Sequence, residues 1–377
     1  ELVANDDGER SIPSCVAYSS HNGELIIGTQ AAQQTMSNPK GTLRGFRNIL
    51  GRSMDHADVK EQQEEMAFTL EGHPDNAAQP SYRIEVMHEG SDDVTVRHIM
   101  PEHVTKEYIR HLVDIAKAYI RAEVVGAVIS IPATFDETQK KSIRAAAAGA
   151  GVPQTQLVHE PVAAALAYHA VAPKDANEAR LAARPDQRIL VADLGGHSFN
   201  ATVLSQNDGM WTIMASADDH DLGGTHFDDV LVDYIRAEFK RKYKTEIPAG
   251  NRRSMMKLRR SAEITKRALS RQDTAPCSVE SAYDGLDFHG SINRGRFDAM
   301  AASLLQRCAQ MVTGLLEKTG LKPEDVDQVL LVGGASQMPG FQQTMRNLFA
   351  NIPELVVRAD FNADEVIASG CAHQAAL

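Results

Sequence analysis

The sequence predicts an α/β protein of two lobes, and three observations lead to this prediction. The chain has 377 residues, whereas a single hydrophobic core stops growing at ~250–300 residues. Strand-like and helical patterns alternate from about residue 101 onward, an order that favours parallel sheets flanked by helices. Two buried strand patterns, residues 189–192 and 329–332, are each followed closely by paired glycines, and α/β proteins bind ligands at such strand ends.

The first lobe opens with a stretch that lacks long regular elements. Short β-like runs such as residues 82–87 are separated by Gly, Pro, Asn and Asp, which indicates a small α+β subdomain over about residues 11–90. A strand over residues 127–131 is predicted to be buried, and it precedes a helix with Asp136 as its N-cap. A strand over 156–158 leads into a helix over 161–168. Before these elements, apolar residues at helical spacing predict one more helix: Val104, Tyr108, Leu112, Ile115 and Tyr119.

The second lobe follows residues 171–187, which are rich in Ala, Pro and charge and are interpreted as an interlobe connection or a solvated insertion. After the strand at 189–192, three amphipathic helices are expected, over residues 227–239, 251–271 and 297–315. The strand 329–332, a helix from Pro339 and a last helix from about Asp364 follow. The expected division places residues 1–170 and 345–377 in lobe I and residues 171–344 in lobe II, which has a small subdomain over about residues 223–296.

Composition excludes several classes of function. The net charge of −11 argues against non-specific binding to nucleic acid, and the sequence shows no sign of sequence-specific binding either. No apolar run approaches the ~20 residues that a membrane-spanning helix needs, so no membrane partner is expected. The four cysteines are far apart and form no CxxC pair, which favours a reducing, cytoplasmic setting.

The strongest local signal is the strand–turn–strand pattern of residues 189–204. Gly195 and Gly196 let the backbone approach a ligand closely, and the turn N–H groups that follow, at His197 and Ser198, can bind an anion. Asp193 ends the first strand, where a carboxylate can hold Mg²⁺ through water. An ordinary hairpin with a Gly-Gly turn is the alternative interpretation.

Two further signals are weaker when taken alone. Gly333 and Gly334 follow the strand 329–332 and precede a helix, which fits either a ligand loop or a plain strand–helix connection. Four polar residues on the helix 251–271 could bind ribose and stack on adenine, or they could simply form a solvated helix face. These residues are Glu263, Lys266, Arg267 and Ser270.

Four passages, in this order, resemble the DnaK-type heat shock protein 70 family: residues 128–135, 159–168, 193–196 and 332–334. Weaker similarity extends over nearly the whole chain. The resemblance implies the nucleotide-binding domain of that family, which has an actin-like ATPase fold with two lobes, each a mixed β-sheet with flanking helices and a smaller subdomain. It also implies ATP and Mg²⁺ as cofactors.

Carried over by position, the resemblance assigns a role to each motif. Residues 195–198 and Gly223 with Gly224 would face the phosphates, Asp193 would lie near Mg²⁺, and Glu160 would couple the nucleotide to movement of the lobes. The adenosine would be framed by Glu263, Lys266, Arg267, Ser270, Gly333, Gly334 and Asp364.

The chain departs from the family pattern on the phosphate side. Arg47 stands where the family has its catalytic lysine, and the planar Arg fork differs from the compact Lys ammonium. The third Gly of the family turn is His197, a following Asp is Asn200, and an adenine-stacking Arg is Gln337. The family's first phosphate hairpin would precede Glu1, so we expect a longer protein to supply it, the alternative being its loss. The end at Leu377 likewise leaves out a peptide-binding domain. Because Arg47, His197 and Asn200 change groups that position the reacting phosphate and water, weak or absent ATP hydrolysis is expected.

Within the family, the chain is most similar to the Ssz-type atypical chaperones of the ribosome-associated complex. Residues 38–40 with 46–47, and residues 264–270, 284–289 and 368–370, carry this similarity. It implies a J-protein partner of the zuotin type, and access through it to the ribosome and the nascent chain. The alternatives are a conventional ATP-hydrolysing chaperone and, more remotely, a small-molecule kinase of the same fold.

Overall fold

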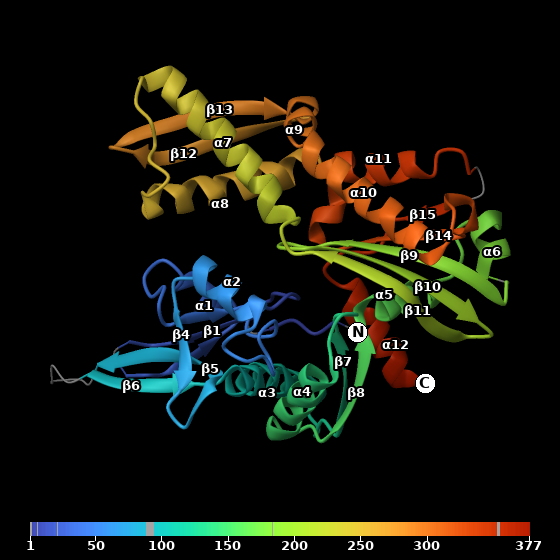
Figure 1. Cartoon of the computed structure of the whole chain (residues 1–377), viewed down its shortest axis with the longest axis horizontal. Helices are drawn as coiled ribbons and strands as arrows, with labels where there is room; N and C mark the ends of the chain where they lie inside the picture. The colour runs from blue at the N-terminus through green and yellow to red at the C-terminus, as the bar shows by residue number, and fades with distance from the viewer. Residues whose placement is uncertain (1, 6, 21, 88–93, 183, 353–354) are drawn as a thin grey trace. The chain divides into compact units, whose positions relative to one another are not determined.

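The computed structural model describes residues 2–5, 7–20, 22–87, 94–182, 184–352 and 355–377. The chain divides into two compact units, Glu1–His159 with Gln374–Leu377 and Glu160–His373 (Figure 1). Both units combine helices with sheets, which confirms the predicted α/β class.

The first unit begins with the small α+β region that the sequence predicted. Two antiparallel sheets of three strands each enclose a core around Leu43, Phe46 and Tyr82. The elements are β1 (Cys15–Tyr18), β2 (Leu25–Ile27), α1 (Thr29–Gln33), β3 (Thr42–Arg44), α2 (Ala57–Glu65), β4 (Thr69–His73), β5 (Asn76–Met87) and β6 (Val94–Ile99).

The rest of the first unit follows the expected strand–helix–strand order. It contains α3 (Pro101–Ile120), β7 (Gly126–Ile131), α4 (Glu137–Gly149) and β8 (Gln154–His159). Asp136 caps α4 as expected, accepting a hydrogen bond from the Gln139 amide at 2.9 Å. The parallel pairing of β7 with β8 is also as expected. The prediction of a buried strand was wrong, because β7 has only β8 as a neighbour among the described strands, and in β7 only Ile131 is buried.

A five-stranded sheet organises the second unit. Its order is β11-β10-β9-β14-β15, antiparallel over the first three strands and parallel over the last three. The strands are β9 (Asp186–Leu194), β10 (Phe199–Asn207), β11 (Met210–Asp219), β14 (Gln328–Val332) and β15 (Val356–Arg358). Side chains alternate between two cores, so Leu190 packs in the core that contains Phe341, whereas Val191 packs in the core that contains Tyr168.

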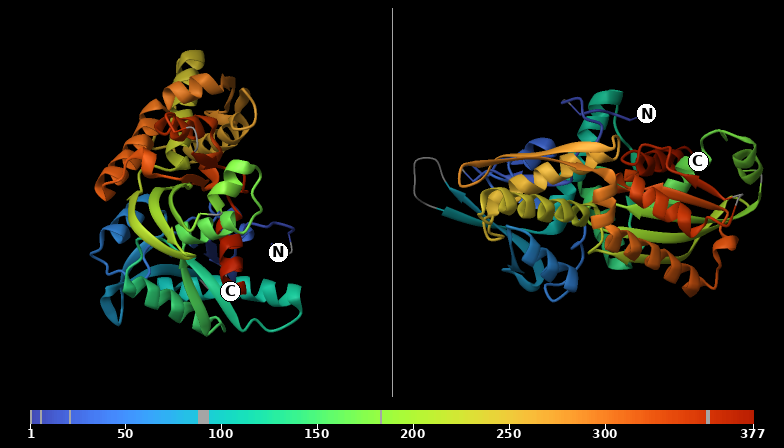
Figure 2. Two further views of the ribbon diagram at one scale, coloured as in Figure 1. Left: turned by 90° about the vertical axis from the view of Figure 1, so that its right-hand side faces the viewer. Right: turned by 90° about the horizontal axis from the view of Figure 1, so that it is seen from above.

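Helices cover both faces of this sheet (Figures 1 and 2). α10 (Ala302–Thr319) and α11 (Pro339–Leu348) belong to the first core, and α5 (Glu160–His169) and α12 (Val366–Ala376) to the second. The two helices of the second core approach closely, because a side chain at Gly370 would overlap with the backbone of Ala163.

The small subdomain of the second unit consists of two helices on a hairpin. α7 (Gly224–Tyr243) packs against α8 (Arg252–Leu269), and α8 packs on β12 (Thr274–Tyr283), which pairs with β13 (Leu286–Asn293). α6 (Ala176–Ala182) lies within residues 171–187. The predicted single helix over 297–315 is two helices, α9 (Arg294–Met300) and α10, because Ala301 leaves the helical region with ψ at 4°. Two short 3₁₀ helices are η1 (Pro323–Asp325) and η2 (Gly334–Gln337).

The segment after residue 345, expected in lobe I, lies with the second unit as far as His373. The parallel pairing of β15 with β14 accounts for this placement. No helix among the described residues is long and apolar enough to cross a membrane.

Arg358 at the end of β15 anchors this segment. Its guanidinium makes a two-pronged contact with the Asp360 carboxylate, at 3.1 and 2.9 Å, and lies 4.9 Å from the ring centroid of Tyr168 on α5. Although burial acts to raise the pKa of Asp360, hydrogen bonds from Arg358 and Lys174 outweigh it and lower that pKa to about 2. The Arg358 side chain is only 6% exposed. Its removal would deprive the Asp360 carboxylate of its two-pronged partner.

We therefore predict that Arg358→Met destabilises the second unit by roughly 2 kcal/mol, because it removes hydrogen bonds to the Asp360 carboxylate, which is 26% exposed and keeps only Lys174 as a charged partner. Urea unfolding followed by the fluorescence of Trp211, the only tryptophan, measures this unit. Because the native pKa of Asp360 lies below its unfolded value, the wild-type protein should also lose stability as pH falls from about 4 towards 2, and the variant should lose less. Arg241→Met, which breaks an exposed pair with Glu238, is the control and should cost under about 1 kcal/mol.

Candidate functional site

Three glycine pairs meet at one edge of the five-stranded sheet in the second unit. Because β9 and β14 are parallel neighbours, with Val332 opposite Asp193, the loops that follow them leave the sheet at the same edge. The turn 195–198 joins β9 to β10, Gly333 and Gly334 follow β14, and Gly223 and Gly224 begin α7.

Backbone hydrogen bonds join the turn to the start of α7. The Gly195 amide donates to the Ser198 carbonyl at 2.9 Å and closes the turn. The amides of Gly224 and Thr225 donate to the carbonyls of Gly195 and Gly196, at 2.9 and 2.8 Å. The first amides of α7 therefore hold the turn in place.

Close packing explains why glycine occupies two of these positions. A side chain at Gly223 would overlap with the backbone of His197 and Ser198. Gly333 has a positive φ of 84°, and a side chain there would overlap with the Asp193 carboxylate and the Leu194 carbonyl. Ser336 reinforces the second loop, since its hydroxyl donates to the Gly333 carbonyl at 2.7 Å.

The assembled loops leave a surface on which a phosphate could lie. Gly196, His197 and Gly334 are exposed, and no atom lies within 4 Å of the position that a side chain at Gly196 would occupy. A cradle of backbone with a short glycine turn suits an anion, because amide N–H groups supply the positive ends of fixed dipoles. These observations fit the predicted phosphate site.

Asp193 is the candidate Mg²⁺ ligand. It is half-buried in β9 and lies directly opposite Asn200 on β10, so both side chains share one face of the sheet. The Asn200 amide donates to the Ser198 hydroxyl at 3.2 Å. Among the described residues, no group of three or more His, Cys, Asp or Glu could hold a metal ion. A Mg²⁺ ion at Asp193 would therefore take most of its ligands from water and phosphate, as Mg²⁺ usually does.

Lys266 has a different setting from the one expected. Its ammonium pairs with Asp228 Oδ1 at 2.9 Å and donates to the Gly224 carbonyl at 2.7 Å. The side chains of both Lys266 and Asp228 are only 10% exposed. The ammonium thus already has two protein partners beside the phosphate turn.

The other predicted residues on α8 remain accessible. Glu263 and Arg267 form an ion pair of 2.8 Å on the exposed side of the helix, and the Arg267 side chain is 77% exposed. Ser270 follows the helix and donates to the Lys266 carbonyl at 3.3 Å. Asp364 places Oδ1 beside Gly334. A planar guanidinium on an open face could stack on adenine.

Two predicted residues belong to other elements than these loops. Glu160 is the first residue of α5 in the second unit and is half-buried. Arg47 belongs to the first unit, where it is exposed in the turns after β3. The second unit therefore contains every candidate residue except Arg47.

Sequence reasoning missed His226 and Asp228, both in the first turns of α7. His226 Nδ1 accepts a hydrogen bond from the Gly223 amide at 2.9 Å. The sequence does contain one indication of the buried ion pair, which is the position of Asp228 between the apolar residues Phe227 and Leu231. A carboxylate on the apolar face of a helix needs a buried partner.

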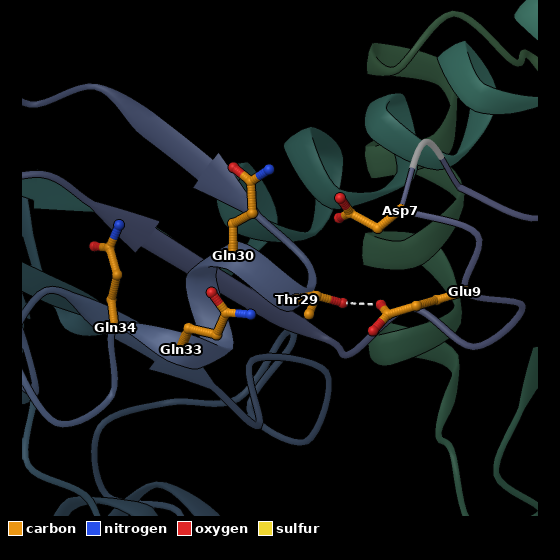
Figure 3. A pocket seen from close by; sticks show the side chains of 6 residues that line it. All are labelled: Asp7, Glu9, Thr29, Gln30, Gln33 and Gln34. Carbon is orange, nitrogen blue, oxygen red and sulfur yellow. Dashed lines mark hydrogen bonds between the residues drawn. The ribbon is translucent and has the colours of Figure 1, made fainter.

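A separate polar hollow lies on the first unit (Figure 3). Its lining consists of carboxylates, amides and one hydroxyl, and the Thr29 hydroxyl donates to Glu9. The lining residues are Asp7, Glu9, Thr29, Gln30, Gln33 and Gln34, so none of the predicted site residues contributes to it.

Comparison with known proteins agrees with the resemblance. The sequence matches the Hsp70 protein family over residues 1–377. It is 36% identical to heat shock 70 kDa protein 14 of Danio rerio and 32% identical to heat shock 70 kDa protein 14 of Homo sapiens, across all of this chain and 70% and 69% of those proteins. A heat shock protein 70 homologue of Schizosaccharomyces pombe is 34% identical, across all of this chain and 64% of its own length.

The close approach at Gly223 leads to a prediction. Gly223→Ala should destabilise the second unit by roughly 2 kcal/mol, because the new methyl group overlaps with backbone that cannot move without breaking the turn. Urea unfolding followed by Trp211 fluorescence measures the change. Gly196→Ala is the matched control, with open space and an ordinary φ, and should change stability by less than about 0.5 kcal/mol. Equal effects of the two substitutions would contradict the packing argument.

Proposed function

The chain belongs to the Hsp70 family, and from this premise we propose that it binds Mg·ATP at the glycine loops of its second unit and hydrolyses it slowly or not at all. The observation that carries the proposal is the meeting of three glycine pairs at the sheet edge beside Asp193. In this assignment the turn 195–198 binds phosphate, and Asp193 holds Mg²⁺ through water.

Different residues of the proposed site would bind the adenosine and the phosphates. Glu263 and Arg267 would hold the adenosine from the open face of α8, and Gly334 with the neighbouring Asp364 would also contact it. Mg²⁺, when bound, neutralises charge on the phosphates. The backbone amides of the glycine loops would bind the phosphates, since such amides bind anions without a charged side chain.

Slow hydrolysis follows from the residues that would position the attacking water. Phosphoryl transfer depends on positioning and on charge stabilisation, so changes in the positioning groups reduce turnover more than binding. Arg47 offers a planar fork instead of a compact ammonium. His197 is exposed in the phosphate turn, and Asn200 faces Asp193 with an amide where a second carboxylate would help to order Mg²⁺ and its water. ATP would then stabilise the folded domain by mass action.

We further propose the cellular role that the Ssz-type similarity implies. The protein would act in the cytoplasm with a zuotin-type J-protein, and through this partner it would reach the ribosome and assist the folding of nascent chains. A conventional ATP-hydrolysing chaperone is the alternative, favoured by the presence of all three glycine pairs. The two proposals differ in the expected rate of hydrolysis.

Calorimetry of Mg·ATP binding and single-turnover hydrolysis, on one sample of the full-length protein, test the proposal. We expect saturable binding with a hydrolysis rate well below that of a conventional Hsp70 chaperone. Arg47→Lys combined with His197→Gly should raise the rate at least about tenfold, which corresponds to roughly 1.4 kcal/mol of transition-state stabilisation. Lys242→Gln, a charge change on the last turn of α7, is the control and should leave the rate unchanged. A wild-type rate equal to that of a conventional chaperone would overturn slow hydrolysis, and absence of binding would overturn the whole function.

A further inference from the structure

The first turns of α7 contain a buried carboxylate with no assigned role. Asp228 lies one turn after Gly224, between apolar residues of the helix, and its side chain is 10% exposed. Burial raises the pKa of Asp228 to about 6, while Lys266 acts to lower it and the nearby carboxylates of Glu263 and Asp229 act to raise it. A carboxylate in such a place is costly unless a cation and hydrogen bonds compensate it.

Lys266 on α8 supplies the compensating charge and also makes a second contact. Its ammonium lies 2.9 Å from Asp228 Oδ1 and 2.7 Å from the Gly224 carbonyl oxygen. Both partners belong to α7, so the lysine joins α8 to the beginning of the neighbouring helix. The carboxylate supplies the opposite charge, and the carbonyl accepts a hydrogen bond from the same ammonium.

The second contact connects the ion pair to the phosphate turn. Gly224 accepts from Lys266 through its carbonyl and donates through its amide to the Gly195 carbonyl at 2.9 Å. The next amide, of Thr225, donates to the Gly196 carbonyl at 2.8 Å. A continuous chain of polar contacts therefore runs from Asp228 through Lys266 and Gly224 to the turn.

We propose that Asp228 is a positioning residue of the nucleotide site: it holds the Lys266 ammonium against the Gly224 carbonyl and thereby fixes the phosphate turn without touching the nucleotide. The inference rests on the proposed function, since it deepens the assignment of the same site. It gives Lys266 a structural part in place of the direct contact with adenosine that the family resemblance implies.

The two roles for Lys266 lead to opposite effects of changing Asp228. If Lys266 binds the nucleotide directly, neutralising Asp228 frees its ammonium and affinity stays the same or rises. If Asp228 positions Lys266, the same change loosens Gly224 and affinity falls. The fall should be confined to ligands with phosphates, because the contact chain ends at the turn 195–198.

The first experiment needs no nucleotide. Hydrogen–deuterium exchange of the ligand-free full-length protein is compared for wild type, Asp228→Asn and Asp229→Asn. Asp229 is the matched control, because it also joins α7 to α8, through Arg259 at 3.2 Å, but at an exposed site. Asp228→Asn should speed exchange of the Gly224 and Thr225 amides roughly tenfold, as expected for a hydrogen bond to a charged group that is weakened. Unchanged exchange would overturn the proposal, whether or not the protein binds ATP.

The second experiment measures affinity by calorimetry with Mg·ATP, Mg·ADP and adenosine. Asp228→Asn should weaken both nucleotides about tenfold, leaving adenosine within about twofold, whereas Asp229→Asn should change none of them. An equal loss for adenosine, or no loss for ATP, would contradict positioning. If the wild type binds neither nucleotide, the proposed function fails, and the exchange experiment still decides the role of Asp228.

A double variant separates positioning from general stability. Asp228→Leu with Lys266→Met replaces the buried pair by apolar side chains, which often restores stability that either single change removes. The melting temperature should recover towards the wild-type value, while the Gly224 and Thr225 amides should still exchange fast, because the Gly224 carbonyl has lost its donor. Recovery of both quantities together would show that the pair serves stability alone and would overturn the proposal.

Discussion

The parallel pairing of β9 with β14 is the constraint on which the site depends. In-register pairing of Val332 with Asp193 brings the ends of two strands, 139 residues apart in sequence (332 − 193), to one sheet edge. The loop after β14 can then pass directly over the Asp193 carboxylate, and it can do so only because Gly333 has no side chain and adopts a positive φ. The start of α7 adds the third loop, held by backbone hydrogen bonds to the turn. A shift in the register of β14 against β9 would therefore move the Gly333–Gly334 loop away from Asp193 and from the other two loops.

The glycine loops could be predicted from the sequence because their chemistry is local. A pair of glycines directly after a buried strand indicates a backbone approach, whatever the rest of the chain does. The setting of Lys266 could not be predicted in this way. Lys266 and Arg267 are adjacent on α8, yet one side chain is 10% exposed and the other 77%, because ~100° of helical rotation separates them. Which of the two points inward depends on α7, and hence on Asp228, a contact between residues 38 positions apart in sequence (266 − 228).

Long-range pairing explains the remaining differences between expectation and fold. Residues 345–358 carry no local signal for a sheet partner, so the sequence could not indicate that β15 pairs with β14 or that Arg358 lies beside Tyr168. The apolar run 127–131 predicts a buried strand, but the burial of a strand depends on how many neighbours it has. Whether a segment forms a helix or a strand could be predicted from its hydrophobic periodicity, because that pattern lies within the segment itself.

The parts of the site built from backbone and the parts built from side chains have different consequences for function. Binding a phosphate needs amides held in a fixed arrangement, and in the proposed site glycine packing, turn hydrogen bonds and the Asp228–Lys266 pair would supply it. Hydrolysis needs charged groups aimed at a water molecule, and the positions to which the family resemblance assigns this role hold Arg47, His197 and Asn200. Phosphate binding depends on backbone atoms, whereas hydrolysis depends on side-chain atoms. The side chains assigned to hydrolysis can therefore change without disturbing the amides that would bind the phosphate. A domain that keeps its nucleotide and turns it over slowly is therefore a physically consistent product of this sequence.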